Sequence, residues 1–139
     1  MRVYLYYIGK ARDPATNRIA ADFVERCARF APCEMREIQP GRFDPWARHS
    51  RARKIFLDPA GREMDSNQFT ALVEKSQMEG RDLVFVVGGA DGLPPDWRDR
   101  ADLLISLSRM TFPHELARVL VAEQIYRALA TLRSHPYPR

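Results

Sequence analysis

An unbroken apolar run, Leu83–Val87, is the feature that most constrains how this chain folds. Its length suits a strand, and its β-branched residues favour a strand that is buried on both faces of a parallel sheet. The run stops at Gly88 and Gly89. Glycines at the carboxyl end of such a strand let a ligand approach the backbone, and open α/β sheets bind ligands at that edge. We therefore expect a parallel sheet with a ligand site just after this run.

Strand and helix patterns alternate along the rest of the chain. Further strands are predicted at residues 2–8, 34–38, 54–57 and 103–105, and helices at residues 15–31, 65–80 and 113–133. Residues 58–61 have the composition of a turn. In a chain of 139 residues this order indicates a single α/β domain, residues 1–139, around a mostly parallel sheet.

The predicted helices carry more specific signals. In the first, apolar residues at helical spacing mark the expected buried side: Ile19, Phe23, Cys27 and Phe30. In the second, Asp65 and Gln68 have the spacing of a capping box, which predicts where the helix begins. The last helix has apolar residues over more of its surface than one sheet covers. We therefore expect it to pack against a second copy of the chain in a homodimer.

Arginine dominates the positive charge of this chain. Of the 22 basic residues only Lys10, Lys54 and Lys75 are lysine, and the net charge is +4. Arginine binds phosphate through two parallel hydrogen bonds and stacks on bases, so the composition favours a polyanionic partner such as RNA. The same arginine usage also follows from a G+C-rich genome, and the composition leaves this alternative open.

The arginines are concentrated in residues 39–53, where prolines and a glycine indicate a connection rather than a regular element. Its arginines and aromatic residues have the composition of a surface that holds a phosphate backbone and stacks a base: Arg42, Arg48, Arg51, Arg53, Phe43 and Trp46. A solvated loop whose Trp46 packs on the sheet is the competing interpretation.

Several classes of protein are disfavoured. No apolar run approaches the roughly 18 residues that a membrane span needs, and the amino terminus lacks the small-residue cleavage site of a signal peptide. We therefore expect a cytoplasmic protein without a membrane partner. Cys27 and Cys33 lack the spacing and the neighbours of a zinc site, so we expect reduced thiols and no metal.

Two polar loops are the candidates for chemistry. Residues 88–92, GGADG, fit neither the dinucleotide-binding pattern nor the P-loop, and alone are compatible with a plain tight turn. Residues 106–114 follow the next strand, so their hydroxyl groups and backbone amides would face the same edge and hold a purine and a ribose. Pro113 suits the first turn of a helix. His114 then lies where the macrodipole disfavours a protonated imidazole, and it either contacts substrate or caps and packs the helix.

Three motifs carry a resemblance to a known family. They are LVFVVGGADGL, SLSRMTFPHELARVLVAEQIYRA and a late HPY, in that order along the chain. Together they resemble the SPOUT methyltransferases known as ribosomal RNA large-subunit methyltransferase H, and the similarity extends over nearly the whole length. Such a combination is far more specific than any one of its loops.

The resemblance implies an α/β fold with a deep trefoil knot, an exception to the rule of unknotted chains, and a homodimer that pairs through the knot. It implies methylation of N3 of a pseudouridine in 23S rRNA on assembled ribosomes, with S-adenosyl-L-methionine as cofactor. Cofactor contacts would fall on Leu57, Gly88, Gly89, Ser108, Arg109, Met110, Thr111, Phe112 and Pro113. The residues expected toward the substrate, with the tail reaching the partner's pocket, are His114, Arg118, Tyr137 and Arg139.

The chain departs from the family in two places. Pro138 stands where the family's ending has a histidine, which puts full activity in question. The connection at residues 39–53 is short, where the family has a helix. The alternatives are a catalytically weak or silent RNA-binding or ribosome-assembly module, a methyltransferase acting on another RNA such as tRNA, and a small-nucleotide-binding protein without an RNA function.

Overall fold

Five parallel strands form the single sheet of this protein, whose computed structural model describes residues 1–137. The strands lie in the order β2-β1-β4-β3-β5. Their bounds are β1 Val3–Ile8, β2 Cys33–Ile38, β3 Arg53–Glu63, β4 Leu83–Val87 and β5 Leu103–Ser106. Each pairing among these strands is parallel, so the predicted parallel sheet is confirmed.

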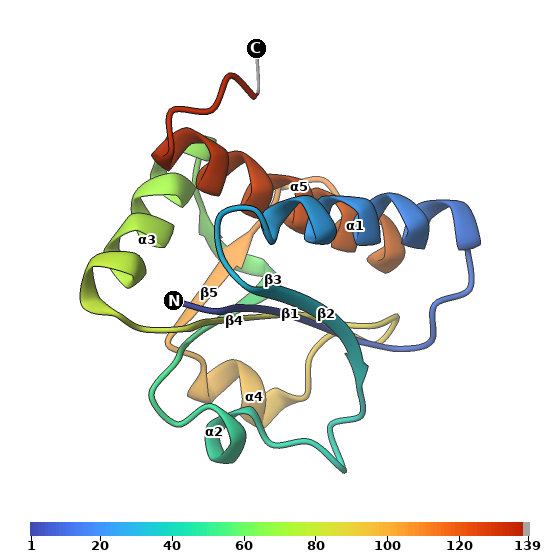
Figure 1. Ribbon diagram of the computed structural model, residues 1–139. Coiled ribbons are helices and arrows are strands. Elements are labelled where there is room, and N and C mark those ends of the chain that lie inside the picture. Colours follow the sequence, from blue (N-terminus) through green and yellow to red (C-terminus); the bar gives the residue numbers. More distant parts are fainter. Residues whose placement is uncertain (138–139) are drawn as a thin grey trace.

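Helices cover both faces of the sheet (Figure 1). The long helices α1 (Pro14–Cys27), α3 (Ser66–Glu79) and α5 (His114–Leu132) lie on one face. The short helices α2 (Pro45–Arg48) and α4 (Pro95–Arg100) lie on the other. Within residues 1–137, each helix is too short or too polar to cross a membrane.

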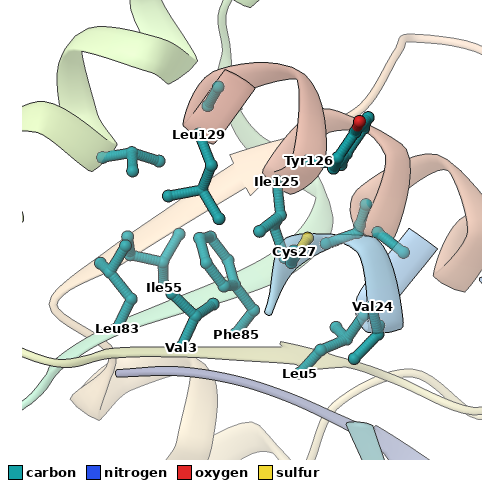
Figure 2. Close-up of a cluster of buried hydrophobic side chains, with 14 of the residues drawn as sticks. Val3, Leu5, Val24, Cys27, Ile55, Leu83, Phe85, Ile125, Tyr126 and Leu129 are labelled. Atoms are coloured by element: carbon teal, nitrogen blue, oxygen red, sulfur yellow. The ribbon is translucent and has the colours of Figure 1, made fainter. Parts of the chain in front are cut away.

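The central strand β4 explains the unbroken apolar run. Leu83, Phe85 and Val87 join the core under α1, α3 and α5, of which Figure 2 shows a part. Val84 and Val86 join a smaller core on the face covered by α2 and α4. Since both faces of β4 are buried, a polar side chain at any position along it would lose its hydration, which explains why the run is apolar throughout.

Helix α1 turns most of its predicted side to the core, with Phe23 and Phe30 packed against it, but its end and one apolar residue differ from the prediction. Asp13 caps its first turn by accepting a hydrogen bond from the backbone N–H of Ala15, and the helix ends at Cys27 rather than at residue 31. Cys27 is buried as expected, together with Val24, but Ile19 is 49% exposed and was assigned to the wrong side. The reason is that α1 packs against α5 as well as on the sheet, so its buried face is not one simple stripe.

Strand β3 is longer than predicted. Residues 58–61 were expected to form a turn, but β3 continues to Glu63, and a register shift after Leu57 lets Arg62 pair with Ile105. Gly61 makes this possible, because a Cβ atom there would lie 2.7 Å from the backbone of Ile105. The turn prediction was therefore wrong, since the segment forms a bulge that wraps closely over β5.

Helix α3 begins as predicted. The side chain of Asp65 accepts from the backbone N–H of Gln68, and the Gln68 side chain accepts from the backbone N–H of Asp65, which completes the capping box. The helix ends at Gly80, whose φ of 67° is the left-handed conformation that glycine adopts without strain. Phe69 and Val73 are its buried apolar side chains.

Candidate functional site

A cavity of about 470 Å³ lies at the carboxyl ends of β4 and β5, beside the part of β3 where the register shifts after Leu57. Its walls come from residues 57–59, from residues 87–90 and Gly92 of the glycine loop, and from residues 106–108 and 110–114 with Ala117 of α5. The two polar loops singled out in the sequence therefore face one cavity. It lies at the edge where open α/β sheets bind their ligands.

Most of the residues predicted to contact a cofactor line this cavity. They are Leu57, Gly88, Gly89, Ser108, Met110, Thr111, Phe112 and Pro113. Arg109 differs, because its side chain is 87% exposed and its Nε lies 3.8 Å from Glu63 Oε1, outside the lining. The sequence reasoning missed Asp58 and Pro59, which also line the cavity. Their position directly after Leu57 was the signal that could have found them.

The glycine loop can close tightly only because it lacks side chains. A Cβ atom on Gly88 would lie 2.7 Å from the carbonyl carbon of Gly92, and one on Gly89 would lie 2.9 Å from the Ile8 carbonyl oxygen. Gly92 has a φ of 76°, and its N–H donates to the Gly89 carbonyl oxygen at 3.0 Å. The loop thus leaves bare backbone at the cavity wall, where a ligand can approach closely.

The second loop is held by its own serines. The Ser106 hydroxyl donates to the Ser108 carbonyl oxygen at 2.8 Å, and the Ser108 hydroxyl accepts from the backbone N–H of Met110 at 3.0 Å. These two bonds link residues 106, 108 and 110 at the end of β5 and so give the loop internal support.

The amino terminus of α5 opens onto the cavity. Pro113 is its cap residue, and no side chain in the described part of the protein caps the first turn. The N–H groups of that turn carry the positive end of the helix dipole, which suits a carboxylate or another anion. His114 is the first residue of α5, half-buried, and lines the cavity.

Arg118 is fully buried, beneath the loop that follows β1. Its Nη2 donates to the carbonyl oxygens of Ile8 and Gly9, at 3.4 and 3.2 Å, and its guanidinium carbon lies 3.8 Å from the ring centre of Tyr7. Burial lowers the pKa of Arg118. It does not line the cavity, so the structure places it one layer behind the wall rather than at the surface a substrate would touch.

Glu115 ties the same region together. Its carboxylate accepts hydrogen bonds from the backbone N–H groups of Arg12 and Asp13, and lies 3.7 Å from Nη1 of Arg118. The bond from the Arg12 backbone, more than any other contact, holds the pKa of Glu115 below its usual value. Glu115 and Arg118 therefore fasten the start of α5 to the loop between β1 and α1.

Tyr137 lies against the carboxyl half of α5, away from the cavity. Its hydroxyl donates to Glu123 Oε2 at 2.6 Å, and its ring centre lies 4.7 Å from that of Tyr126. Burial, and then the bond to Glu123, raise the pKa of Tyr137 to about 12. Arg139, the other tail residue predicted to act on substrate, lies outside the described residues.

The arginine-rich connection is partly different from its prediction. Arg53 is buried and donates hydrogen bonds to Ser76 and Glu79, so it was wrongly included in the phosphate-binding surface. Trp46 packs edge-on against Phe56 and Trp97, each at 5.6 Å. The interpretation that Trp46 packs on the sheet is therefore confirmed.

Comparison with known proteins identifies the family. A family model described as "Predicted SPOUT methyltransferase" matches residues 1–138. The ribosomal RNA large subunit methyltransferase H of Solibacter usitatus is 66% identical over 139 residues, which are 100% of both chains. The protein of the same name from Allorhizobium ampelinum is 35% identical over 159 aligned residues, covering 100% of this chain and 99% of that protein.

A solved structure agrees at the level of the fold. The AdoMet-bound rRNA methyltransferase from Sinorhizobium meliloti superposes with a TM-score of 0.55 at 13% identity, over 91% of this chain and 56% of that one. The resemblance found in the sequence motifs is confirmed by the family model and by the closely similar relative. It follows that this chain is a methyltransferase of the SPOUT family.

Proposed function

We propose that this protein uses S-adenosyl-L-methionine to methylate N3 of a pseudouridine in the 23S rRNA of the ribosome. The observation that carries the proposal is that both loops expected to hold the cofactor line one cavity. They do so in a chain that is 66% identical, over its whole length, to a ribosomal RNA large subunit methyltransferase H. The rRNA methyltransferase of similar fold, with AdoMet bound, supports the choice of cofactor.

The residues around the cavity fit this cofactor. A volume of about 470 Å³ is in the range of sites for small organic ligands. Leu57 and Phe112 offer apolar surface to an adenine, and the bare backbone at Gly88 and Gly89 lets a ribose approach. The uncapped start of α5 suits the carboxylate of the methionine part.

The protein's contribution to the reaction is positioning and proton transfer. The bound cofactor supplies an electrophilic methyl group on a sulfonium, so the protein must align the attacking nitrogen and lower its affinity for its proton. His114 lines the cavity, and a neutral imidazole there accepts the N3 proton, with water as the other candidate. Single-turnover methylation by His114→Ala separates them, because an unchanged rate excludes His114 as the base.

A homodimer completes the proposed enzyme. Leu116 on α5 is 42% exposed, and Leu120 lines a second cavity of about 440 Å³ beside Phe112 and Gln124. Apolar surface of this kind on a long helix favours packing against a second copy. The proposal keeps the expectation, implied by the resemblance, that the tail serves the partner's cofactor cavity.

The proposal includes a deep trefoil knot and a cytoplasmic location. The knot is supported by the match to the SPOUT family model, and the close contact of Gly61 in β3 with the backbone of Ile105 in β5 is compatible with it. An enzyme that modifies assembled ribosomes works in the cytoplasm, where ribosomes are found.

The proposal is tested by mass spectrometry of 23S rRNA from a strain that lacks this protein. We expect one methylated pseudouridine to be missing and to return when the wild-type protein is supplied. Unchanged methylation of 23S rRNA in the deletion strain would refute the proposed substrate, and a missing methyl group in tRNA instead would redirect it.

A further inference from the structure

The connection from β2 to β3, which includes α2, lies on the sheet face opposite α1, α3 and α5 (Figure 1). This connection and β2 carry a group of exposed arginines that the chemistry at the cavity does not use. We call this group the arginine platform and define it as Arg36, Arg42, Arg48 and Arg51. Arg36 is on the edge strand β2, and the other three follow in the connection from β2 to β3.

The connection is fixed to the sheet by its aromatic residues. Phe43 packs 4.8 Å from the ring of Tyr6, and His49 lies 4.3 Å from the ring of Tyr4. His49 Nε2 also shares a hydrogen bond of 2.8 Å with the Tyr6 hydroxyl. These contacts hold the chain on either side of Arg48, so the arginines project from an ordered segment rather than from a loose loop.

Helix α2 adds a second anchor. Asp44 accepts from the backbone N–H groups of Trp46 and Ala47, at 2.9 and 3.2 Å, and so caps this short helix. Trp46 packs edge-on into the smaller core, and the guanidinium of Arg100 lies 3.9 Å from its ring centre on the other side. Trp46 is therefore a structural anchor, and the arginines around it are left to face solvent.

The four arginines form no ion pair within the described residues, and Glu34, two residues before Arg36, is the carboxylate on the same face of β2. Asp44 is the one carboxylate within residues 39–52, and its side chain is occupied by capping α2. Arg36 instead lies over the rings of Tyr6 and Phe43, at 5.6 and 5.5 Å, a contact that leaves its N–H groups free to bind an anion.

We infer that the arginine platform is a docking surface for the phosphate backbone of the RNA substrate, separate from the cavity where methyl transfer occurs. The inference rests on the proposed function, which makes RNA the partner. Guanidinium groups bind phosphate through two parallel hydrogen bonds, and an ordered backbone lowers the entropy lost when several phosphates are held at once. An acidic protein surface would also bind arginine, and the test below separates the two.

The test compares three sets of substitutions in binding to a fluorescein-labelled RNA hairpin, measured by fluorescence anisotropy at several salt concentrations. The first set replaces Arg42, Arg48 and Arg51 by alanine. The second replaces the same residues by lysine. The matched control replaces three exposed basic residues by alanine: Arg18 on α1, Arg29 in the turn after α1, and Lys75 on α3.

We expect the alanine set to flatten the slope of log affinity against log salt by about 2, which corresponds to three lost phosphate contacts. The lysine set should keep most of the slope, because it keeps the charge, and the control set should match wild type. Calorimetry with S-adenosylmethionine should give the same affinity for all variants. A wild-type slope in the alanine set, or an equal loss in the control set, would overturn the inference and leave the platform to a protein partner.

Methylation of ribosomes distinguishes this inference from the proposed function. We expect the platform alanine set to raise the KM for ribosomes several-fold and to leave kcat near the wild-type value. If wild type methylates 23S rRNA and the alanine set does so with an unchanged KM, the platform inference fails and the proposed function stands. If the wild-type protein does not methylate 23S rRNA but the alanine set binds the RNA hairpin more weakly than wild type does, the platform inference stands and the proposed function fails.

Discussion

Gly89 lies so close to Ile8 that a Cβ atom at residue 89 would come within 2.9 Å of the Ile8 carbonyl oxygen. The neighbour is backbone, which cannot rotate away as a side chain can. The same carbonyl oxygen accepts a hydrogen bond from Arg118, so it is held from both sides. The glycine wall of the cavity is thus set directly by the end of β1.

Replacing Gly89 by alanine is therefore expected to weaken the binding of S-adenosylmethionine. The added Cβ must push the glycine loop away from Ile8, and overpacking of this kind costs about 1–3 kcal/mol. We expect the affinity to fall by about 5- to 150-fold, measured by calorimetry. Gly41→Ala is the matched control, because nothing lies within 4 Å of a Cβ there. Wild-type affinity in Gly89→Ala would show that the loop does not shape the cofactor site.

Arg118→Met should destabilise the fold rather than only slow the reaction. It would leave the carbonyl oxygens of Ile8 and Gly9 without their buried donor and Glu115 without its cation. We expect a loss of about 3 kcal/mol in the free energy of unfolding, measured with urea. Arg18→Met, on the exposed side of α1, should stay close to wild type. If Arg118→Met keeps wild-type stability but loses activity, Arg118 acts on substrate and not on the fold.

Local patterns in the sequence were enough to predict those elements whose structure is determined by residues close to one another in the sequence. The apolar run Leu83–Val87 predicted the central strand, and Asp65 with Gln68 predicted the start of α3. Ile19 was assigned wrongly because the buried side of α1 is set jointly by the sheet and by α5. The extension of β3 through Gly61 depends on β5, and a pattern within residues 58–61 could not show it.

The same distinction between local and long-range signals applies to the residues of the candidate site. Its two loops were predicted because each follows a buried strand and carries a contiguous motif, and both line the cavity. Arg118 was expected near the substrate, yet it bonds to the Gly9 carbonyl, 109 positions earlier in the chain. An arginine within an apolar helix gives no sign of whether backbone carbonyls or a ligand will satisfy it.

The bond between Tyr137 and Glu123 predicts a stability change in alkaline solution. The pKa of Tyr137 is raised from 10.0 to about 12, so the folded protein keeps a proton that the unfolded chain releases. The preference for the protonated hydroxyl comes first from burial and then from the bond to Glu123, and its contribution to stability is present below pH 10 and lost as the pH rises toward 12. Tyr6, whose pKa is also raised to about 12, contributes in the same range.

We therefore expect the free energy of unfolding to fall across this pH range, and to fall less steeply in Tyr137→Phe. Denaturant unfolding at a series of pH values measures both slopes. A slope in Tyr137→Phe equal to that of wild type would mean that the tail does not rest on α5 in solution.

The proposed dimer predicts opposite results for two exposed apolar residues. Leu116 lies on α5 and is 42% exposed, whereas Met78 lies on α3 and is 81% exposed. Leu116→Arg should convert the dimer to a monomer in analytical ultracentrifugation at micromolar concentration, because it places a charge in the interface. Met78→Arg should leave the dimer intact. A wild-type protein that sediments only as a 16.1 kDa species would remove the dimer altogether.

The most direct test of the central claim is methyl transfer by the purified protein. Ribosomes from a strain lacking this protein are incubated with it and with S-adenosylmethionine that carries an isotopically labelled methyl group, and the digested RNA is analysed by mass spectrometry. The account predicts the label in one nucleoside of 23S rRNA, a pseudouridine methylated at N3. Protein that binds the cofactor but leaves 23S rRNA unlabelled, or that labels tRNA instead, would contradict it.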